Sequence, residues 1–361
     1  MRESFDIRSS IRDYRVTIGI GVARAILRPD VDRKTSIILC DRYFETLIRE
    51  SGNRYVSIDV NEKAKSLESI PRILEQFREQ GCDRGTELCA VGGGVVQDVA
   101  TLCASLYMRG ITWSYVPTTL LGMADSCIGG KSAINVGQYK NLVGNFYPPT
   151  EIFVDPEFVT SLSIEQRVAG LCEAAKICYA AGAGPFANFL NAASDTRSEL
   201  HSFQRIISLS LSGKKGIIER DEFDKGDRLL LNFGHTFGHA LEAASGFAIS
   251  HGVAVGLGMC MAIHLSNVTG NFDVEPSRTH MLYSYLETIL TEIPDIKRGL
   301  ADVRWNVFLS SFLSDKKHRN GMMAIVLINA KGDLVMREVP QNETWVGHVK
   351  RSMTEVMKRW E

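Results

Sequence analysis

The sequence predicts an α/β domain at the N-terminal end and a mainly α-helical domain after it. Up to about residue 155, short apolar runs alternate with stretches of helical periodicity, which favours a parallel sheet with crossover helices. Three consecutive glycines, residues 92–94, directly follow one apolar run and open a helical stretch, which fits a strand-to-helix turn of such a sheet. Beyond residue 155 the pattern is mostly helical. We therefore expect one domain over residues 1–155 and a second over residues 156–361.

The elements of the first domain follow one another in a regular order. Apolar runs bounded by polar residues predict strands, and longer stretches with a period near 3.6 predict helices. The expected strands are 36–40, 55–58, 88–91 and 111–116, and the expected helices are 42–50, 69–80 and the stretch from the glycines to residue 107.

The second domain has a distinct apolar helix. The stretch 253–265 is hydrophobic on every side, so we expect it to be buried among other helices. Near the end of the chain, 323–328 and 334–339 flank the turn residues 329–332 and predict a β-hairpin. A final helix is expected from about residue 343.

Composition narrows the class of protein. The chain has 361 residues, 45% of them hydrophobic, which is enough for two domains with substantial cores. Its formal net charge of −1 argues against binding to nucleic acid or to an anionic membrane. Charges run through the first 21 residues, and we expect no apolar stretch long enough to span a membrane. A cytoplasmic location is therefore expected. The eight cysteines form no C-x-x-C pair, which predicts buried, reduced thiols.

Two loops have the composition of an anion site. Gly92, Gly93 and Gly94 would place backbone amides at a helix N-terminus, where a pyrophosphate binds well, although a tight structural turn has the same signature and the G-x-G-x-x-G spacing is absent. The second loop contains Lys131, Lys140 and Asn141 and suits a phosphate, although lysines on a solvated loop are common. Asp125 stands where a P-loop requires glycine, which excludes an ATPase of that type.

A histidine cluster predicts a divalent metal site. His235 and His239 are four residues apart and share a face if the segment is helical, and His251 follows closely in a chain with eight histidines. A carboxylate would complete the site, and Glu173 in an apolar stretch is the best candidate; a surface ion pair between Glu173 and Lys176 is the rival interpretation. The HExxH motif of zinc proteases is absent.

Taken together, these motifs resemble the sugar-phosphate cyclases, and within them the dehydroquinate synthase family. The matching stretches run in the family's order from about residue 36 to residue 330. They are GGGVVQD at 92–98, YMRG at 107–110, VPTTLL at 116–121, DSCIGGK at 125–131, Lys140-Asn141, EAAK at 173–176, LNFGHTFGH at 231–239, His251-Gly252 and DKK at 315–317.

The resemblance implies a dehydroquinate synthase-like fold with a nucleotide-binding domain, a metal-binding helical domain, and an active site in the cleft between them. It implies that zinc or cobalt binds to Glu173, His235 and His251, whereas His239 contacts substrate. The positions matching NAD contacts are Asp41, Glu62, Lys65, Gly92, Gly93, Gly94, Asp98, Thr118, Thr119 and Lys140.

The resemblance also implies a substrate site and a reaction. Catalytic groups would be Lys131, Asp125, Lys176, His239, Asn232 and Arg109, and further substrate contacts would be Asn141, Lys214, Arg228 and one or both of Lys316 and Lys317. The substrate would be a phosphorylated keto-sugar acid, 3-deoxy-arabino-heptulosonate 7-phosphate. NAD would oxidise it transiently, phosphate would be eliminated, the hydride would return, and an aldol closure would form 3-dehydroquinate. A homodimer is favoured, with Arg109 acting across its interface.

Three departures from the family pattern leave alternatives open. The family usually has glycine at the positions of Gln97 and Thr101, and glutamate at the position of Val253. An aminodehydroquinate synthase, or a cyclase of sedoheptulose 7-phosphate or glucose 6-phosphate, is therefore a second hypothesis. A metal-dependent polyol dehydrogenase that releases NADH is a third, although it would have little use for Lys131, Asn141 and Arg109.

Overall fold

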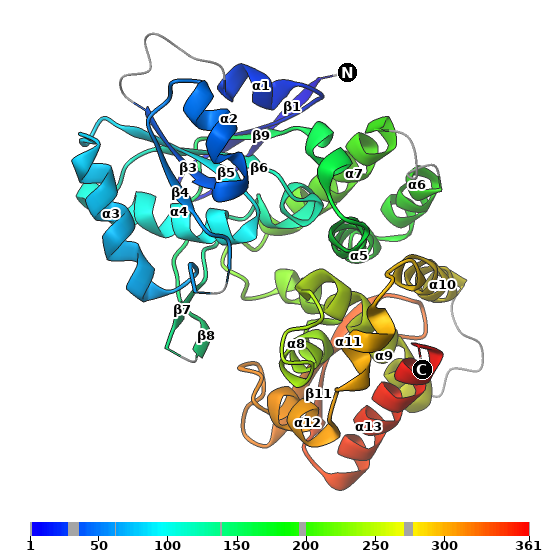
Figure 1. Cartoon of the computed structure of the whole chain (residues 1–361). Coiled ribbons are helices and arrows are strands. Elements are labelled where there is room, and N and C mark those ends of the chain that lie inside the picture. Colours follow the sequence, from blue (N-terminus) through cyan, green and yellow to red (C-terminus); the bar gives the residue numbers. More distant parts are fainter. Residues whose placement is uncertain are drawn as a thin grey trace. The chain divides into compact units, whose positions relative to one another are not determined.

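The computed structural model describes residues 2–27, 36–61, 63–137, 139–194, 200–270 and 277–360 (Figure 1). By its contacts the chain forms two units. The first comprises Met1–Leu162 and Ala192–Glu222, and the second comprises Ser163–Asn191 and Phe223–Glu361. This grouping is discontinuous and differs from the single boundary after residue 155 that we expected. Helix α7 (Leu200–Ile218) belongs to the first unit because its buried side chains pack there.

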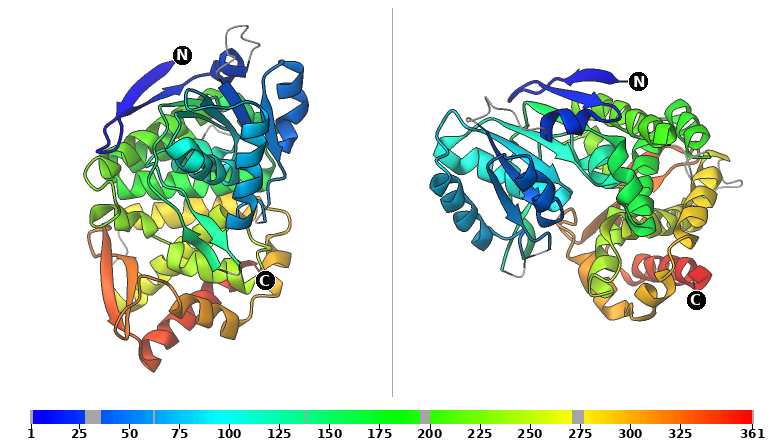
Figure 2. Two further views of the ribbon diagram at one scale, coloured as in Figure 1. Left: turned by 90° about the vertical axis from the view of Figure 1, so that its left-hand side faces the viewer. Right: turned by 45° about the horizontal axis from the view of Figure 1, so that its top comes forward.

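The first unit is built on a seven-stranded sheet of order β1-β2-β9-β6-β5-β3-β4. All neighbouring pairs are parallel except β1 and β2, which are antiparallel. Figure 2 shows these two N-terminal strands in dark blue at the edge of the sheet. The strands are β1 (Glu3–Ile7), β2 (Tyr14–Ile18), β3 (Ser36–Asp41), β4 (Tyr55–Ile58), β5 (Glu87–Gly92), β6 (Trp113–Pro117) and β9 (Glu151–Val154).

Both faces of the central strands are buried, as a parallel sheet with crossover helices requires. Ile38 and Cys40 of β3 and Val91 of β5 face a core that also contains Val22 and Ile48 of the flanking helices. The four strands expected from the sequence are confirmed as β3, β4, β5 and β6. Strands β1, β2 and β9 were missed, because β1 alternates exposed polar residues with partly buried ones and offers no apolar run.

The helices and short elements of the first unit surround this sheet. They are α1 (Val22–Leu27), η1 (Arg42–Phe44), α2 (Glu45–Glu50), η2 (Leu67–Ser69), α3 (Ile70–Glu79), α4 (Gly94–Leu106), η3 (Tyr107–Arg109), the π-helical turn η4 (Gly122–Ser126), the small hairpin β7 (Ile134–Val136) and β8 (Tyr139–Val143), η5 (Pro156–Ser161) and α7.

The second unit is mainly helical. Its elements are α5 (Ile164–Ala180), α6 (Ala183–Ala193), which extends to the boundary between the units, η6 (Asp227–Asn232), α8 (His235–Ala244), α9 (His251–Gly270), α10 (Ser277–Thr291), α11 (Ile296–Ala301), α12 (Trp305–Leu313), the hairpin β10 (Met322–Ile328) and β11 (Leu334–Pro340), α13 (Glu343–Met357) and η7 (Lys358–Trp360). The expected hairpin and final helix are confirmed.

Helix α9 is the centre of this unit and contacts α5, α8, α10 and α13. It corrects one expectation from the sequence, since α9 is long and apolar enough to cross a membrane by length and composition. However, 78% of its apolar window is buried inside the protein, which is the pattern of a core helix. The eight cysteines are all buried and free, as expected.

Candidate active site

The predicted nucleotide contacts meet at one end of the first unit's sheet. Strands β3, β5 and β6 are adjacent and parallel, so their carboxyl ends share an edge. Asp41 ends β3, Gly92 ends β5, and Thr118 and Thr119 follow β6. This edge is where open α/β sheets bind their ligands.

The glycine run has two different physical roles. A Cβ on Gly93 would lie 2.9 Å from Thr119 Cγ2, so this glycine allows close packing. A Cβ on Gly94 would meet no atom within 4 Å, so the backbone at the start of α4 opens onto free space. The first amides of a 13-residue helix face that space and suit an anion such as a pyrophosphate.

Two other predicted nucleotide residues, Lys65 and Asp98, contact each other. Lys65 and Asp98 form an ion pair of 2.7 Å, and Asp98 also accepts a hydrogen bond of 2.9 Å from the backbone amide of Ala133. Lys140 is exposed on β8. Glu62 lies outside the described residues.

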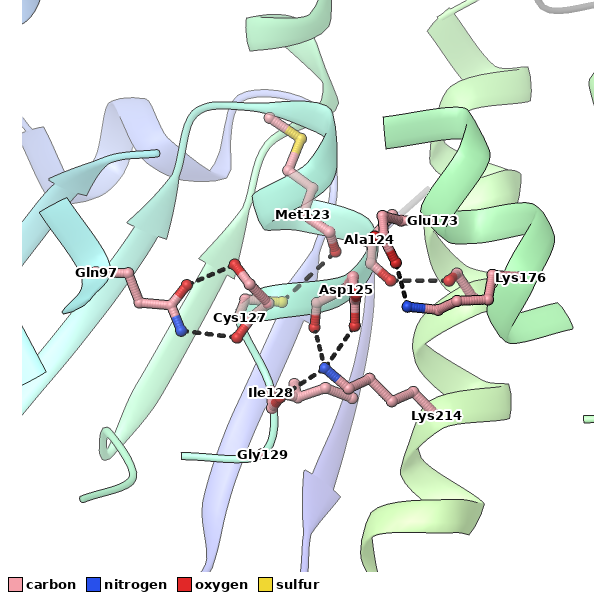
Figure 3. A network of polar contacts seen from close by, with 12 residues as sticks. Gln97, Met123, Ala124, Asp125, Cys127, Ile128, Gly129, Glu173, Lys176 and Lys214 are labelled. Atoms are coloured by element: carbon pink, nitrogen blue, oxygen red, sulfur yellow. Dashed lines mark hydrogen bonds and ion pairs between the residues drawn. The ribbon is translucent and has the colours of Figure 1, made fainter. Parts of the chain in front are cut away.

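Asp125 lies in a π-helical turn held by side chains of α7 (Figure 3). The Lys214 ammonium lies 2.6 Å from Asp125 Oδ1 and donates to the carbonyls of Asp125 (2.6 Å) and Ile128 (3.0 Å). An ammonium has three donors, and this turn offers three acceptors. Lys214, predicted as a substrate contact, is therefore engaged with the Asp125 segment in this structure.

The remaining predicted groups of the first unit are more exposed. The Lys131 ammonium lies 5.9 Å from the centre of the Phe146 ring. Asn141 is exposed with a φ of 52°, and its backbone amide donates to Asn135 Oδ1 over 2.9 Å. Arg109 is exposed with a φ of 68° beyond the far end of α4. A 13-residue helix spans about 18 Å, so the structure does not bring Arg109 to the glycine end.

Three potential metal ligands converge in the second unit. Glu173 Oε1 lies 3.8 Å from His235 Nε2 and 3.7 Å from His251 Nε2. These separations are too long for hydrogen bonds. Two ligands of one tetrahedral zinc, each about 2.1 Å from it, are about 3.4 Å apart. The donor set and its spacing therefore fit a divalent ion such as zinc or cobalt.

The contact made by Nδ1 of each histidine explains why Nε2 is the nitrogen that would face a metal ion. His235 Nδ1 lies 3.3 Å from the carbonyl oxygen of Phe233, and His251 Nδ1 lies 3.1 Å from Glu242 Oε2. An Nδ1–H that donates to these oxygens leaves each Nε2 lone pair directed toward Glu173. Burial lowers the pKa of His251, but the hydrogen bond and charge of Glu242 and the charge of Glu173 raise it overall. Glu242 was not predicted from the sequence, although it lies seven residues after His235 on the same helix.

Close helix packing places the three donors. A Cβ on Gly252 would lie 2.3 Å from the carbonyl oxygen of Ala169, so the start of α9 lies against α5. A Cβ on Gly258 would lie 2.1 Å from the carbonyl oxygen of Gly234, which brings α9 against the start of α8. Glycine at these positions thus allows α5, α8 and α9 to carry Glu173, His235 and His251 to one point.

Glu173 takes part in an ion pair and also faces the two histidines. Lys176 does form an ion pair with Glu173, through Oε2, but the pair is buried and not on the surface (Figure 3). Oε1 faces the two histidines at the same time. The Lys176 ammonium thus lies beside the carboxylate that would hold the ion.

His239 stands at the rim of this cluster. Its ring centre lies 5.5 Å from that of His235 and 5.7 Å from that of His251. Desolvation, followed by the charge of His251, lowers the pKa of His239 to about 4, so its imidazole is neutral near pH 7. His239, Glu242 and His251 form a second possible donor set, but Glu242 is already hydrogen-bonded to His251 Nδ1.

The charge of Lys317 contributes to the lowered pKa of His239, and Lys317 also pairs with Asp315 over 2.6 Å. Lys316, in contrast, is exposed. The structure thus favours Lys317 of the two lysines. Arg228 is buried in η6. Asn232 ends the same element and donates to the carbonyl oxygen of Leu229 over 3.0 Å.

Comparisons with known proteins cover both units. The family described as 3-dehydroquinate synthase N-terminal matches residues 55–169, and that described as 3-dehydroquinate synthase C-terminal matches residues 170–318. The chain is 32% identical over 357 residues to the 3-dehydroquinate synthase of Clostridium kluyveri, which covers 95% of this chain and 97% of the relative.

Two solved structures share the fold. A 2-deoxy-scyllo-inosose synthase in complex with carbaglucose-6-phosphate, NAD⁺ and Co²⁺ superposes with a TM-score of 0.81 and 22% identity, covering 98% of this chain and 100% of that chain. A 2-epi-5-epi-valiolone synthase from Streptomyces hygroscopicus with NAD⁺ and Zn²⁺ bound has a TM-score of 0.78 and 23% identity, covering 98% of this chain and 99% of that chain. At this identity the likeness concerns the fold.

Proposed function

Because the chain belongs to the 3-dehydroquinate synthase family, we propose that it converts 3-deoxy-arabino-heptulosonate 7-phosphate to 3-dehydroquinate and phosphate. The observation that carries the proposal is the convergence of Glu173, His235 and His251, with both histidines oriented by acceptors at Nδ1. NAD and a divalent metal, zinc or cobalt, are the proposed cofactors. Binding of both in cyclases of this fold supports this assignment.

The proposal assigns the cofactors to different units. Glu173, His235 and His251 would hold the metal, and the start of α4 at Gly93 and Gly94 would hold the pyrophosphate of NAD. When bound, the metal would acidify a substrate hydroxyl, and NAD would accept the hydride from the carbon that carries this hydroxyl and later return it. The remaining nucleotide contacts would come from Asp41, Lys65, Asp98, Thr118, Thr119 and Lys140, with Glu62 as a further proposed contact.

The chain's cations would control the elimination of phosphate. Lys131 and Asn141 are proposed to bind the phosphate together with Arg109 supplied by a second copy of the chain across the interface of the proposed homodimer. Lys176 beside the metal donors would stabilise negative charge that develops on the substrate. Neutral His239 could accept or donate a proton at a substrate hydroxyl near pH 7. Asp125 and Asn232 are proposed to orient the substrate hydroxyls.

A second set of cations supports a substrate that carries a carboxylate. Arg228 is buried, and Lys317 lies near His239. Lys214 would join them only by exchanging one of its present contacts with the Asp125 segment. A carboxylate on the substrate would give these cations a further anionic partner, which a neutral substrate would not supply.

The alternative hypotheses are weaker. The secondary-metabolism cyclases share the fold, but their identity to this chain is lower than that of the dehydroquinate synthases. A polyol dehydrogenase would not need the side chains that are proposed to bind phosphate, namely Lys131, Asn141 and Arg109. We further propose a cytoplasmic homodimer that binds neither nucleic acid nor membrane, in keeping with the net charge of −1.

A phosphate-release assay tests the proposed function. Purified protein is loaded with Zn²⁺ or Co²⁺ and given catalytic NAD with 3-deoxy-arabino-heptulosonate 7-phosphate or sedoheptulose 7-phosphate. We expect phosphate release from the acid, formation of 3-dehydroquinate, and no accumulation of NADH, because the hydride returns within each turnover. Faster turnover of sedoheptulose 7-phosphate than of the acid would refute the proposed substrate. Formation of NADH in proportion to the substrate consumed would favour the polyol dehydrogenase.

A further inference from the structure

Gln97 connects helix α4 to the segment that contains Asp125. Its side-chain Nε2 donates to the carbonyl oxygen of Ser126 over 2.7 Å, and its Oε1 accepts from the Ser126 hydroxyl over 2.6 Å. Figure 3 marks both contacts as dashed lines from the labelled Gln97 side chain. Gln97 is 5% exposed, whereas Ser126 is half-buried. One amide therefore binds the carbonyl and the hydroxyl of the residue directly after Asp125.

Other side chains hold the same segment, residues 122–129, which we call the Asp125 turn. The Ser210 hydroxyl donates to the carbonyl oxygen of Ala124 over 2.8 Å, and Lys214 binds the carbonyls of Asp125 and Ile128. The Tyr14 hydroxyl accepts from the amide of Gly129 over 2.8 Å. The turn is thus bound by elements that lie far apart in the sequence.

Such a turn needs external contacts because its backbone is irregular. Residues 122–126 form a π-helical turn, a geometry that is rare and persists where surrounding contacts determine it. Ser210 and Lys214, which lie on α7, bind residues of this turn. Gln97, which lies on α4, binds Ser126. Gln97 alone among these contacts comes from the helix that begins at Gly93 and Gly94.

We propose that Gln97 is a positioning residue, which fixes the Asp125 turn relative to the helix α4 that opens the nucleotide edge. The inference rests on the proposed function, in which α4 binds NAD and Asp125 contacts substrate. Gln97 acts through Ser126 and Asp125, because its buried amide is engaged with the turn. Both halves of the amide are needed, since glutamate cannot donate to the Ser126 carbonyl and methionine supplies neither strong hydrogen bond.

Hydrogen exchange tests the structural half without any substrate. In Gln97→Met, we expect amide exchange in peptides covering residues 122–128 to accelerate about 5- to 30-fold, which corresponds to the loss of two partly buried hydrogen bonds. Ser126→Ala removes only the hydroxyl contact and should give a smaller acceleration. The matched control is Thr101→Val, which removes a buried hydrogen bond to the Gln97 carbonyl and leaves the side-chain amide in place. Equal exchange in Gln97→Met and the control would overturn the inference.

A double-mutant cycle with Asp125→Asn tests the functional half. In the wild-type background, we expect Gln97→Met to lower kcat about 5- to 30-fold with KM for NAD changed less than about twofold. In the Asp125→Asn background, the same substitution should change kcat less than about twofold, because a positioning residue has no effect once its target is lost. An equal loss in both backgrounds would overturn the inference while the role of Asp125 stands. If Asp125→Asn keeps wild-type kcat, Asp125 has no part in the proposed reaction. Gln97 then has only a structural role, which also overturns the inference.

Discussion

Glu242 Oε2 lies 3.1 Å from His251 Nδ1, on the side of the imidazole away from Glu173. Glu242 accepts a hydrogen bond from the imidazole of His251, whose other nitrogen is a proposed metal donor. A carboxylate in this position fixes the tautomer and orientation of the ring and increases its basicity as a ligand. Glu242 thus belongs to the proposed metal site without contacting the ion.

The first prediction concerns this carboxylate. Replacing Glu242 by Ala should weaken metal binding about 10- to 100-fold, because His251 loses its orienting acceptor. Glu242→Gln should lose less, since an amide oxygen still accepts from Nδ1. Metal affinity is measured by competition with a chromophoric chelator. Glu355→Ala, which removes an exposed glutamate paired with Lys358, is the control and should bind metal normally. Equal affinity in the three variants would contradict the role.

The second prediction separates ligand histidines from the rim histidine. His251→Ala should lose most bound metal and turnover, because one of three protein donors is removed. His239→Ala should retain metal while turnover falls, because neutral His239 is proposed to act on substrate. Metal content of the purified variants and kcat are the measurements. Comparable metal loss in both variants would instead support a site centred on the shared helix face of His235 and His239.

The third prediction concerns the packing of α9 against α5. Gly252→Ala places a Cβ 2.3 Å from the carbonyl oxygen of Ala169, so the helices must separate beside His251. We expect unfolding to become easier by about 1–3 kcal/mol and metal affinity to fall. Gly347→Ala in α13 is the matched control, since its Cβ would meet nothing within 4 Å. It should raise stability by about 0.5–1 kcal/mol with unchanged metal binding. Thermal unfolding would show a stable Gly252→Ala variant if this account is wrong.

The fourth prediction concerns substrate choice. Arg228→Ala should lower kcat/KM for 3-deoxy-arabino-heptulosonate 7-phosphate about 10- to 100-fold, which corresponds to a charge-assisted contact of about 1.5–3 kcal/mol. Turnover of sedoheptulose 7-phosphate, which lacks the carboxylate, should change less. The gap between the two substrates therefore narrows. A uniform loss for both would show that Arg228 supports the fold and does not read the carboxylate.

Much of the architecture is visible in local sequence patterns. The periods of 2 and 3.6 residues and the apolar runs predicted strands β3 to β6, helix α9 and the β10–β11 hairpin, because these patterns depend on neighbouring residues. The strand-to-helix glycines at residues 92–94 were visible for the same reason. The edge strand β1 was not, because only two of its five residues, Phe5 and Ile7, are apolar and they form no continuous run.

The sequence by itself determined the family and the residue types available for chemistry, whereas tertiary packing decided how they combine. Spacing could not tell whether His239 or Glu173 joins His235 and His251, since a helix face does not reveal what packs against it. The partnership of Glu242 with His251 and that of Gln97 with Ser126 arise where separate elements meet. Contacts of that kind depend on helix approach within about an ångström, which no local pattern encodes. The fold therefore selected among groups that the sequence had already supplied.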